Sequence, residues 1–94
     1  MLSLSSPIQP HPDVVVTRLD NGEAVLMHMG TASYFTLNST GAQIWALLAQ
    51  GLPPAAIVDQ LVADYAVEID RATASVQALV TQLTEQQLVM VAAA

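Results

Sequence analysis

The sequence predicts an α+β fold in which a three-stranded antiparallel meander is followed by three helices. Between residues 14 and 37, short β-branched and aromatic runs alternate with turn residues, which is typical of adjacent strands. From residue 38 onwards, apolar residues recur at helical spacing. A length of 94 residues with 53% hydrophobic content is enough for one domain with its own core.

The N-terminal residues 1–13 differ in composition from the rest of the chain. They contain three of the five prolines among serines and show no periodicity, so they are expected to form a flexible tail. His11 lies between two prolines in this segment and is interpreted as a solvated tail residue. The folded domain is expected to span residues 14–91.

Three short segments and the turns between them predict the meander. Residues 14–19 form the first strand, which stops at Asn21-Gly22, a pair that supplies the positive φ angles of a tight hairpin turn. Residues 23–29 form the second strand and, after a turn at residues 30–32, residues 33–37 form the third. The middle strand is apolar on both faces, which indicates either cover on both sides or contact with a partner.

The first two helices are predicted from their end signals. Asn38, or Ser39 or Thr40 beside it, is expected to cap the first helix, because its exposed N–H groups need an acceptor. This helix ends at Gly51 in the left-handed conformation. Pro53-Pro54 begins the second helix, where a missing N–H costs nothing.

The third helix is predicted to be the longest. Asp70 is expected to cap it, and its apolar stripe runs to about Gln87. Residues 88–91 either add a final short strand or simply pack against the domain. Trp45, which has apolar neighbours at helical spacing, is interpreted as a core anchor of the first helix. This order of elements is the one that a winged helix-turn-helix domain uses.

The charge distribution counts heavily against nucleic-acid binding. The formal net charge is −6, there is no lysine, and Arg18 and Arg71 are the only arginines. Nucleic-acid binding draws most of its affinity from cations that neutralise phosphates, and two arginines far apart in the sequence cannot supply them. The acidic balance favours a basic partner, or it simply keeps an apolar domain soluble.

The sequence contains no membrane or secretion signal. The longest apolar run, residues 88–94, is far shorter than the ~20 residues of a membrane span. The first residues contain neither a basic region nor a long apolar stretch, so no secretory signal is predicted. The absence of cysteine excludes disulfides, thiolate metal sites and a cysteine nucleophile. A cytoplasmic protein that does not associate with membranes is therefore expected.

No constellation of catalytic residues is visible in the sequence. His28 is interpreted as a strand histidine half-shielded at the sheet rim, since its spacing from His11 fits no familiar metal-ligand pattern. Asp64, Glu68 and Asp70 are interpreted as a solvated acidic rim. Because no nucleophile, base and orienting group occur together, we expect a protein that is not an enzyme and that uses no cofactor or metal.

Residues 37–48 carry a resemblance to a known family. They read LNSTGAQIWALL and resemble the LNxTGAxIWxLL signature of the PqqD-like peptide chaperones, the recognition elements of pathways for ribosomally synthesised and modified peptides (RiPPs). The resemblance covers about residues 14–91. The chain departs from the family pattern at Pro53, where members often have a Ser or Thr cap, and at Gln87, where they often have Gly. It is as similar to components of lasso-peptide or other RiPP pathways as to pyrroloquinoline quinone chaperones.

The resemblance implies a non-catalytic module that binds the leader of a precursor peptide by strand addition and presents it to a peptide-modifying enzyme or leader peptidase. Strand addition uses the unpaired N–H and C=O groups of an edge strand, which an extended peptide satisfies. The implied peptide-binding residues lie on the third strand with its preceding turn and on the third helix: Thr31, Ala32, Ser33, Tyr34, Phe35, Thr36, Leu37, Arg71, Ala72, Ser75, Val76, Leu79 and Gln82. Val76 and Leu79 are expected to belong mainly to the core, with only their rim atoms reaching a ligand.

Two other functions fit the same elements. A structural or dimerisation subunit would use the third helix and residues 88–91 as a partner seam, giving a homodimer. A winged-helix DNA-binding regulator has the same strand and helix order, but the shortage of basic residues counts against it.

Overall fold

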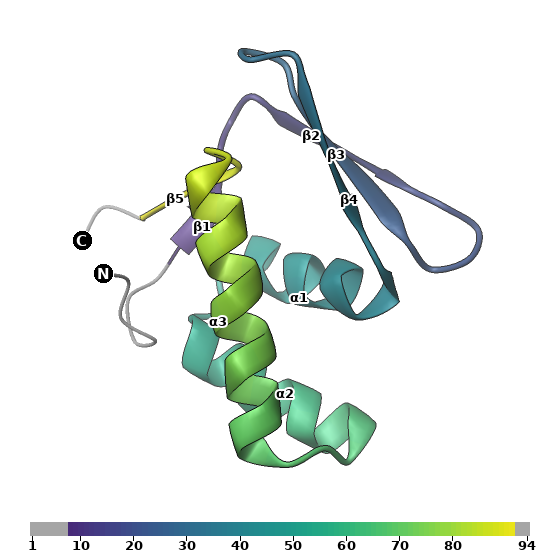
Figure 1. The fold of residues 1–94 in the computed structure, drawn as a ribbon, viewed down its shortest axis with the longest axis vertical. Coiled ribbons are helices and arrows are strands. Elements are labelled where there is room, and N and C mark those ends of the chain that lie inside the picture. The colour runs from purple at the N-terminus through teal and green to yellow at the C-terminus, as the bar shows by residue number, and fades with distance from the viewer. Residues whose placement is uncertain (1–7, 92–94) are drawn as a thin grey trace.

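The computed structural model describes residues 8–91 and contains the predicted meander and three helices, which confirms the predicted fold class (Figure 1). The meander has the strand order β2-β3-β4. Its antiparallel strands are β2 (Val14–Arg18), β3 (Ala24–His28) and β4 (Ser33–Leu37). The helices that follow are α1 (Ser39–Ala49), α2 (Pro54–Tyr65) and α3 (Ile69–Glu85). In this part of the chain, no helix is both long enough and apolar enough to cross a membrane.

A second sheet corrects the interpretation of residues 8–13 as a flexible tail. Strand β1 (Ile8–Pro10) pairs antiparallel with β5 (Val89–Val91), and the side chain of Ile8 is only 2% exposed. The backbone N–H of His11 donates to the carbonyl of Leu88 at 3.0 Å, which continues this pairing. The first seven residues lie outside the described part of the chain. Of the two alternatives for residues 88–91, the structure contains the strand.

The β2–β3 hairpin differs from the predicted tight turn, in which Asn21 and Gly22 both supply positive φ angles. The carbonyl of Leu19 accepts from the Gly22 N–H at 3.1 Å, and the Leu19 N–H donates to the Glu23 carbonyl at 2.9 Å. Gly22 has a φ of +88°, whereas Asn21 is not among the residues with positive φ. These bonds define a three-residue loop that ends in a glycine bulge. Asn21 contributes through its side-chain oxygen, which accepts from the Glu23 N–H at 3.0 Å.

The ends of α1 and α2 confirm the predicted signals. The Oδ1 atom of Asn38 caps α1 by accepting from the Gly41 N–H at 2.7 Å. Gly51, with a φ of +93°, follows the end of α1 in the left-handed conformation. Pro53 is the residue before α2, and Pro54 occupies its first turn.

The ends of α3 correct two predictions. Its N-terminal cap position is occupied by Glu68, which makes no side-chain capping bond, and Asp70 lies within the first turn. A carboxylate there still interacts favourably with the positive end of the helix dipole. The helix ends at Glu85, before the predicted end near Gln87. Gln87 itself has a φ of +61°, a conformation that glycine adopts without strain and other residues adopt rarely.

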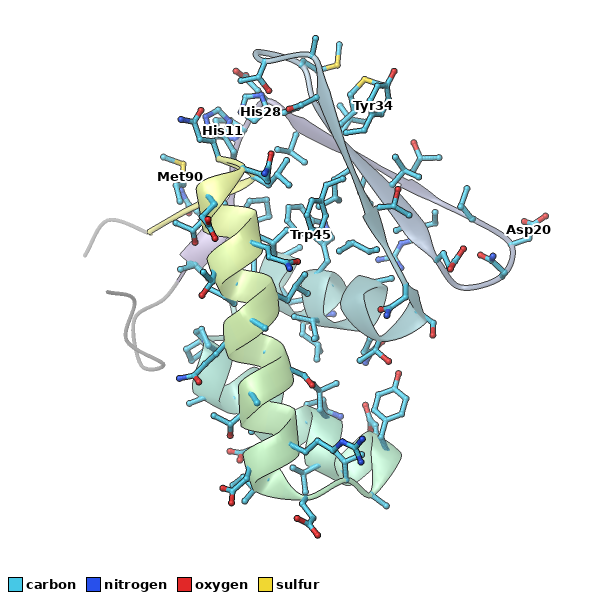
Figure 2. All side chains as sticks on the ribbon, in the orientation of Figure 1. His11, Asp20, His28, Tyr34, Trp45 and Met90 are labelled. Atoms are coloured by element: carbon cyan, nitrogen blue, oxygen red, sulfur yellow. The ribbon has the colours of Figure 1, made fainter. Side chains whose placement is uncertain are left out.

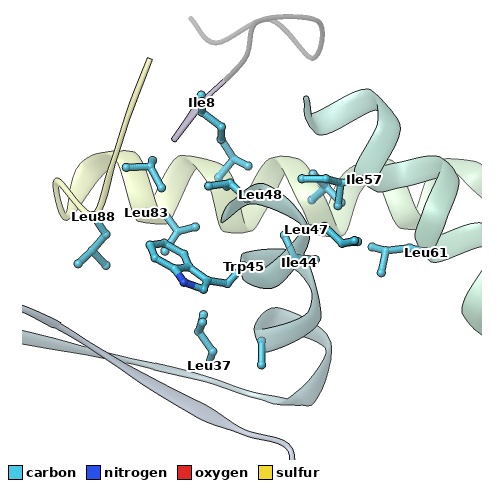
Figure 3. Packing of buried hydrophobic residues seen from close by; sticks show 14 of the residues in the cluster. Ile8, Leu37, Ile44, Trp45, Leu47, Leu48, Ile57, Leu61, Leu83 and Leu88 are labelled. Atoms are coloured by element: carbon cyan, nitrogen blue, oxygen red, sulfur yellow. The ribbon is translucent and has the colours of Figure 1, made fainter. Parts of the chain in front are cut away.

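The core lies between the inner face of the meander and the three helices. Trp45 is 4% exposed and packs in the same cluster as Leu37, Leu83 and Leu88, so its interpretation as a core anchor is confirmed (Figure 3). Residues Leu88 and Val89 are 1% and 5% exposed and belong to this cluster as well. The proposed dimerisation seam at residues 88–91 is therefore wrong for these two residues, because they are buried inside the same chain.

The two faces of the middle strand have different surroundings. Ala24, Leu26 and His28 of β3 are buried on the face towards the helices. On the opposite face, Met27 pairs with Val15 and Tyr34, which are 53% and 68% exposed. Within residues 8–91, no element covers this outer face.

Candidate functional site

Strand β4 forms one edge of the meander, next to β3 only. Two backbone hydrogen bonds at the ends of the β2–β3 pairing establish which backbone groups of β3 point towards β2. The Met29 N–H donates to the Asp13 carbonyl, and the Leu19 N–H donates to the Glu23 carbonyl, each at 2.9 Å. Both bonds join odd-numbered residues, and both continue the register of the β2–β3 pairs. Because the hydrogen-bonding side alternates along a strand, the even-numbered residues of β3 bond to β4.

The alternation identifies the free backbone groups of β4. Its hydrogen-bonded pairs with β3 are Ala24↔Leu37, Leu26↔Phe35 and His28↔Ser33. Tyr34 and Thr36 lie between these pairs, so their N–H and C=O groups point away from the sheet. Both side chains are exposed, and Figure 2 shows Tyr34 pointing away from the helices. Tyr34 and Thr36 therefore offer the backbone donors and acceptors that an added strand needs.

An open groove of about 390 Å³ lies between the start of α1 and the middle of α3. Three of the predicted site residues line it: Ser75, Leu79 and Gln82. The other lining residues, which the sequence did not indicate, are Asn38, Thr40, Gly41, Ile44 and Ala78. The signal that could have located them is the single residue, Asn38, that joins β4 to α1. So short a connection keeps the first turn of α1 beside the end of the edge strand.

The groove combines apolar and polar side chains but contains no charged one. Ile44 and Leu79 supply apolar surface, and Asn38, Ser75 and Gln82 supply hydrogen-bonding groups. This composition suits an uncharged side chain of an extended peptide. It does not combine a nucleophile with a general acid or base, as a catalytic site would. Among the described residues, no group of three or more His, Cys, Asp or Glu is placed to hold a metal ion.

Several predicted site residues lie beneath the surface. The side chains of Leu37, Ala72 and Val76 are at most 2% exposed and form the core under the edge and the groove. Arg71 is exposed near the start of α3 and does not line the groove. The remaining predicted residues follow the turn and β4: Thr31 and Ala32 are exposed, and Ser33 and Phe35 are half-buried.

The two histidines differ from their predicted surroundings. His28 is 3% exposed, so its interpretation as a half-shielded rim residue is wrong. His11 is half-buried rather than solvated, and its ring centroid lies 4.5 Å from that of His28. The β1–β5 pairing brings His11 to this position, and periodicity within the sequence does not reveal that pairing.

Comparison with known proteins identifies a family and two solved structures that are similar to this chain. Residues 23–89 match the family model described as coenzyme PQQ synthesis protein D (PqqD). The structure of TbiB1 in complex with the TbiA(beta) leader peptide is 31% identical, with a TM-score of 0.83, and the match covers 92% of this chain and 99% of that one. The structure of a lasso peptide synthetase B1 complexed with the leader peptide is 32% identical, with a TM-score of 0.81, covering 90% and 99%. No curated protein sequence matched significantly.

Proposed function

Because this chain belongs to the PqqD family, we propose that it binds the leader of a ribosomally synthesised precursor peptide and presents it to a peptide-modifying enzyme or leader peptidase. One observation carries the proposal. Two structures that share the fold over at least 90% of this chain, at 31% and 32% identity, were solved with a leader peptide bound. The lasso-peptide relative makes a lasso-peptide or related pathway the best supported setting.

The proposed binding mode is strand addition to β4. An extended leader pairs with the outward N–H and C=O groups of Tyr34 and Thr36, and each such hydrogen bond contributes about 0.5–1.5 kcal/mol. Alternate leader side chains point towards α3, where the groove beside Ser75, Leu79 and Gln82 receives one of them. The turn at Thr31 and Ala32 and the exposed Arg71 of α3 flank this path.

The module is proposed to act without catalysis and in the cytoplasm. The groove contains no titratable side chain, so it offers no general base that could activate the hydroxyls of Thr40 and Ser75 as nucleophiles. Its role is then to hold the leader while another protein performs the chemistry.

An amide chemical-shift map tests the proposal. The ¹⁵N-labelled chain is titrated with the leader of the precursor encoded beside its own gene, and with the same residues in scrambled order as a control. The native leader is expected to shift the amides of residues 31–37 and of the groove, and the scrambled peptide is not. Saturable shifts confined to α2, with residues 31–37 silent, would reject this site.

A bulky side chain in the groove is expected to block binding without unfolding the protein. Ser75 is exposed and lines the groove, so Ser75→Trp fills space that the leader needs. We expect the Kd for the leader to rise about tenfold or more, equivalent to about 1.4 kcal/mol. Calorimetric titration measures this change, and Gln77→Trp, on an exposed part of α3 outside the groove, serves as the matched control. Equal effects of the two substitutions would contradict a role for the groove.

A further inference from the structure

The buried imidazole of His28 makes contacts that core packing does not require. It lies at the end of β3, is 3% exposed, and is the only buried polar or charged side chain among the described residues. Its Nδ1 atom accepts from the N–H of Gly30 at 3.1 Å and from the N–H of Thr31 at 3.2 Å. These two N–H groups belong to the turn that leads into β4.

Of the two ring nitrogens of His28, only Nδ1 has hydrogen-bond partners among the described residues. Since Nδ1 accepts two hydrogen bonds, the proton of the neutral ring is on Nε2. Nε2 is buried and has no hydrogen-bond partner in the described chain. An apolar side chain would fill the same space without a buried unsatisfied donor. Core stability therefore does not account for an imidazole here, whereas the contacts of Nδ1 with the turn do.

The turn that His28 holds is conformationally demanding. Ala32 has a φ of +55°, a left-handed conformation that alanine adopts only when its surroundings impose it. Gly30 packs so closely that an added Cβ would lie 3.0 Å from Cε1 of His28 and 3.1 Å from Oδ2 of Asp13. The Met29 N–H also donates to the Asp13 carbonyl at 2.9 Å. The turn is thus held from two sides, by the His28 ring and by the segment before β2.

The position of this turn relates it to the open edge. His28 pairs with Ser33, the first residue of β4, and Tyr34 is the next residue along the strand. A change in the conformation of the turn therefore shifts the positions of the free N–H and C=O groups of Tyr34.

We propose that His28 is a positioning residue for leader binding: through Nδ1 it fixes the β3–β4 turn and so places the edge of β4 for strand addition. This inference rests on the proposed function and adds a residue that does not itself touch the leader. His11 supports the His28 ring from the β1 side, with the ring planes tilted by 42°. The proposal predicts that two substitutions of His28 rank in opposite orders for stability and for leader affinity.

Two variants separate the acceptor from the packing. His28→Asn keeps an acceptor at the δ1 position, where an asparagine oxygen bonds to the backbone N–H two residues on, but it leaves a gap where the ring was. His28→Leu fills the space and removes the acceptor. Amide hydrogen exchange of Gly30 and Thr31 in the free protein reports the turn, thermal unfolding reports stability, and calorimetric titration with the leader reports binding.

The expected pattern crosses over between the variants. The leucine variant fills the core space and is expected to unfold at a higher temperature than the asparagine variant, yet to exchange the Gly30 and Thr31 amides faster and to bind the leader about tenfold more weakly. The asparagine variant is expected to unfold at a lower temperature, yet to keep slow exchange and to bind within about threefold of wild type. A leucine variant that binds as tightly as wild type, or an asparagine variant that binds as weakly as the leucine variant, would overturn the proposal. A wild-type protein that binds no leader contradicts the proposed function instead, while the exchange rates still test the turn.

Discussion

Thr36→Pro is expected to weaken leader binding by about tenfold or more and to leave the fold intact. The N–H of Thr36 points away from the sheet, so proline removes a donor to the leader and no bond to β3. Proline is tolerated on an edge strand when its missing N–H faces solvent. Its ring also occupies the space in which an added strand must lie. Calorimetric titration with the leader measures the loss, and circular dichroism verifies the fold.

Two further substitutions at the same edge act as controls. Thr36→Ala removes the same exposed side chain but keeps the N–H, so it is expected to bind within about threefold of wild type. Phe35→Pro removes a donor that faces β3, and it is expected to disrupt the meander itself. A Thr36→Pro variant that folds and binds as tightly as Thr36→Ala would show that the leader does not add to β4.

Local sequence signals predicted most of the fold correctly. The cap at Asn38, the left-handed Gly51 and the proline pair before α2 each act over a few residues, so their chemistry is visible in the sequence. The β1–β5 sheet was missed because it joins strands of three residues each from opposite ends of the domain. Such short strands have no period to detect, and Pro10 at the end of β1 resembles a loop signal.

The candidate site, like the fold, was predicted from the sequence only in part. The family resemblance indicated β4 and α3, and the α3 residues Ser75, Leu79 and Gln82 line a groove that also contains Asn38, the residue that follows β4. The α1 side of that groove and the burial of His28 depend on how distant segments pack. His28 looked like a rim residue because it is polar and ends a strand, but His11 and the following turn enclose it. Only tertiary packing reveals that enclosure.

Trp45→Ala is expected to lower the free energy of unfolding by about 3–5 kcal/mol, the range for removing a buried aromatic side chain. Trp45 is 4% exposed and lies among core residues from β4, α3 and the segment before β5, so its loss leaves a cavity at the junction of these elements (Figure 3). A small domain has a total stability of about 5–15 kcal/mol, so this change removes a large share of it.

Urea unfolding followed by far-ultraviolet circular dichroism measures the effect, because the variant has lost the only tryptophan of the chain and its fluorescence with it. The midpoint is expected to fall while the slope stays unchanged, as for a loss of stability without a change in the unfolded state. Tyr65→Ala is the control: this aromatic side chain is 48% exposed at the end of α2, and its removal is expected to cost less than about 1 kcal/mol. Equal losses in the two variants would contradict the role of Trp45 as the anchor that joins the meander, which offers the edge, to α3, which borders the groove.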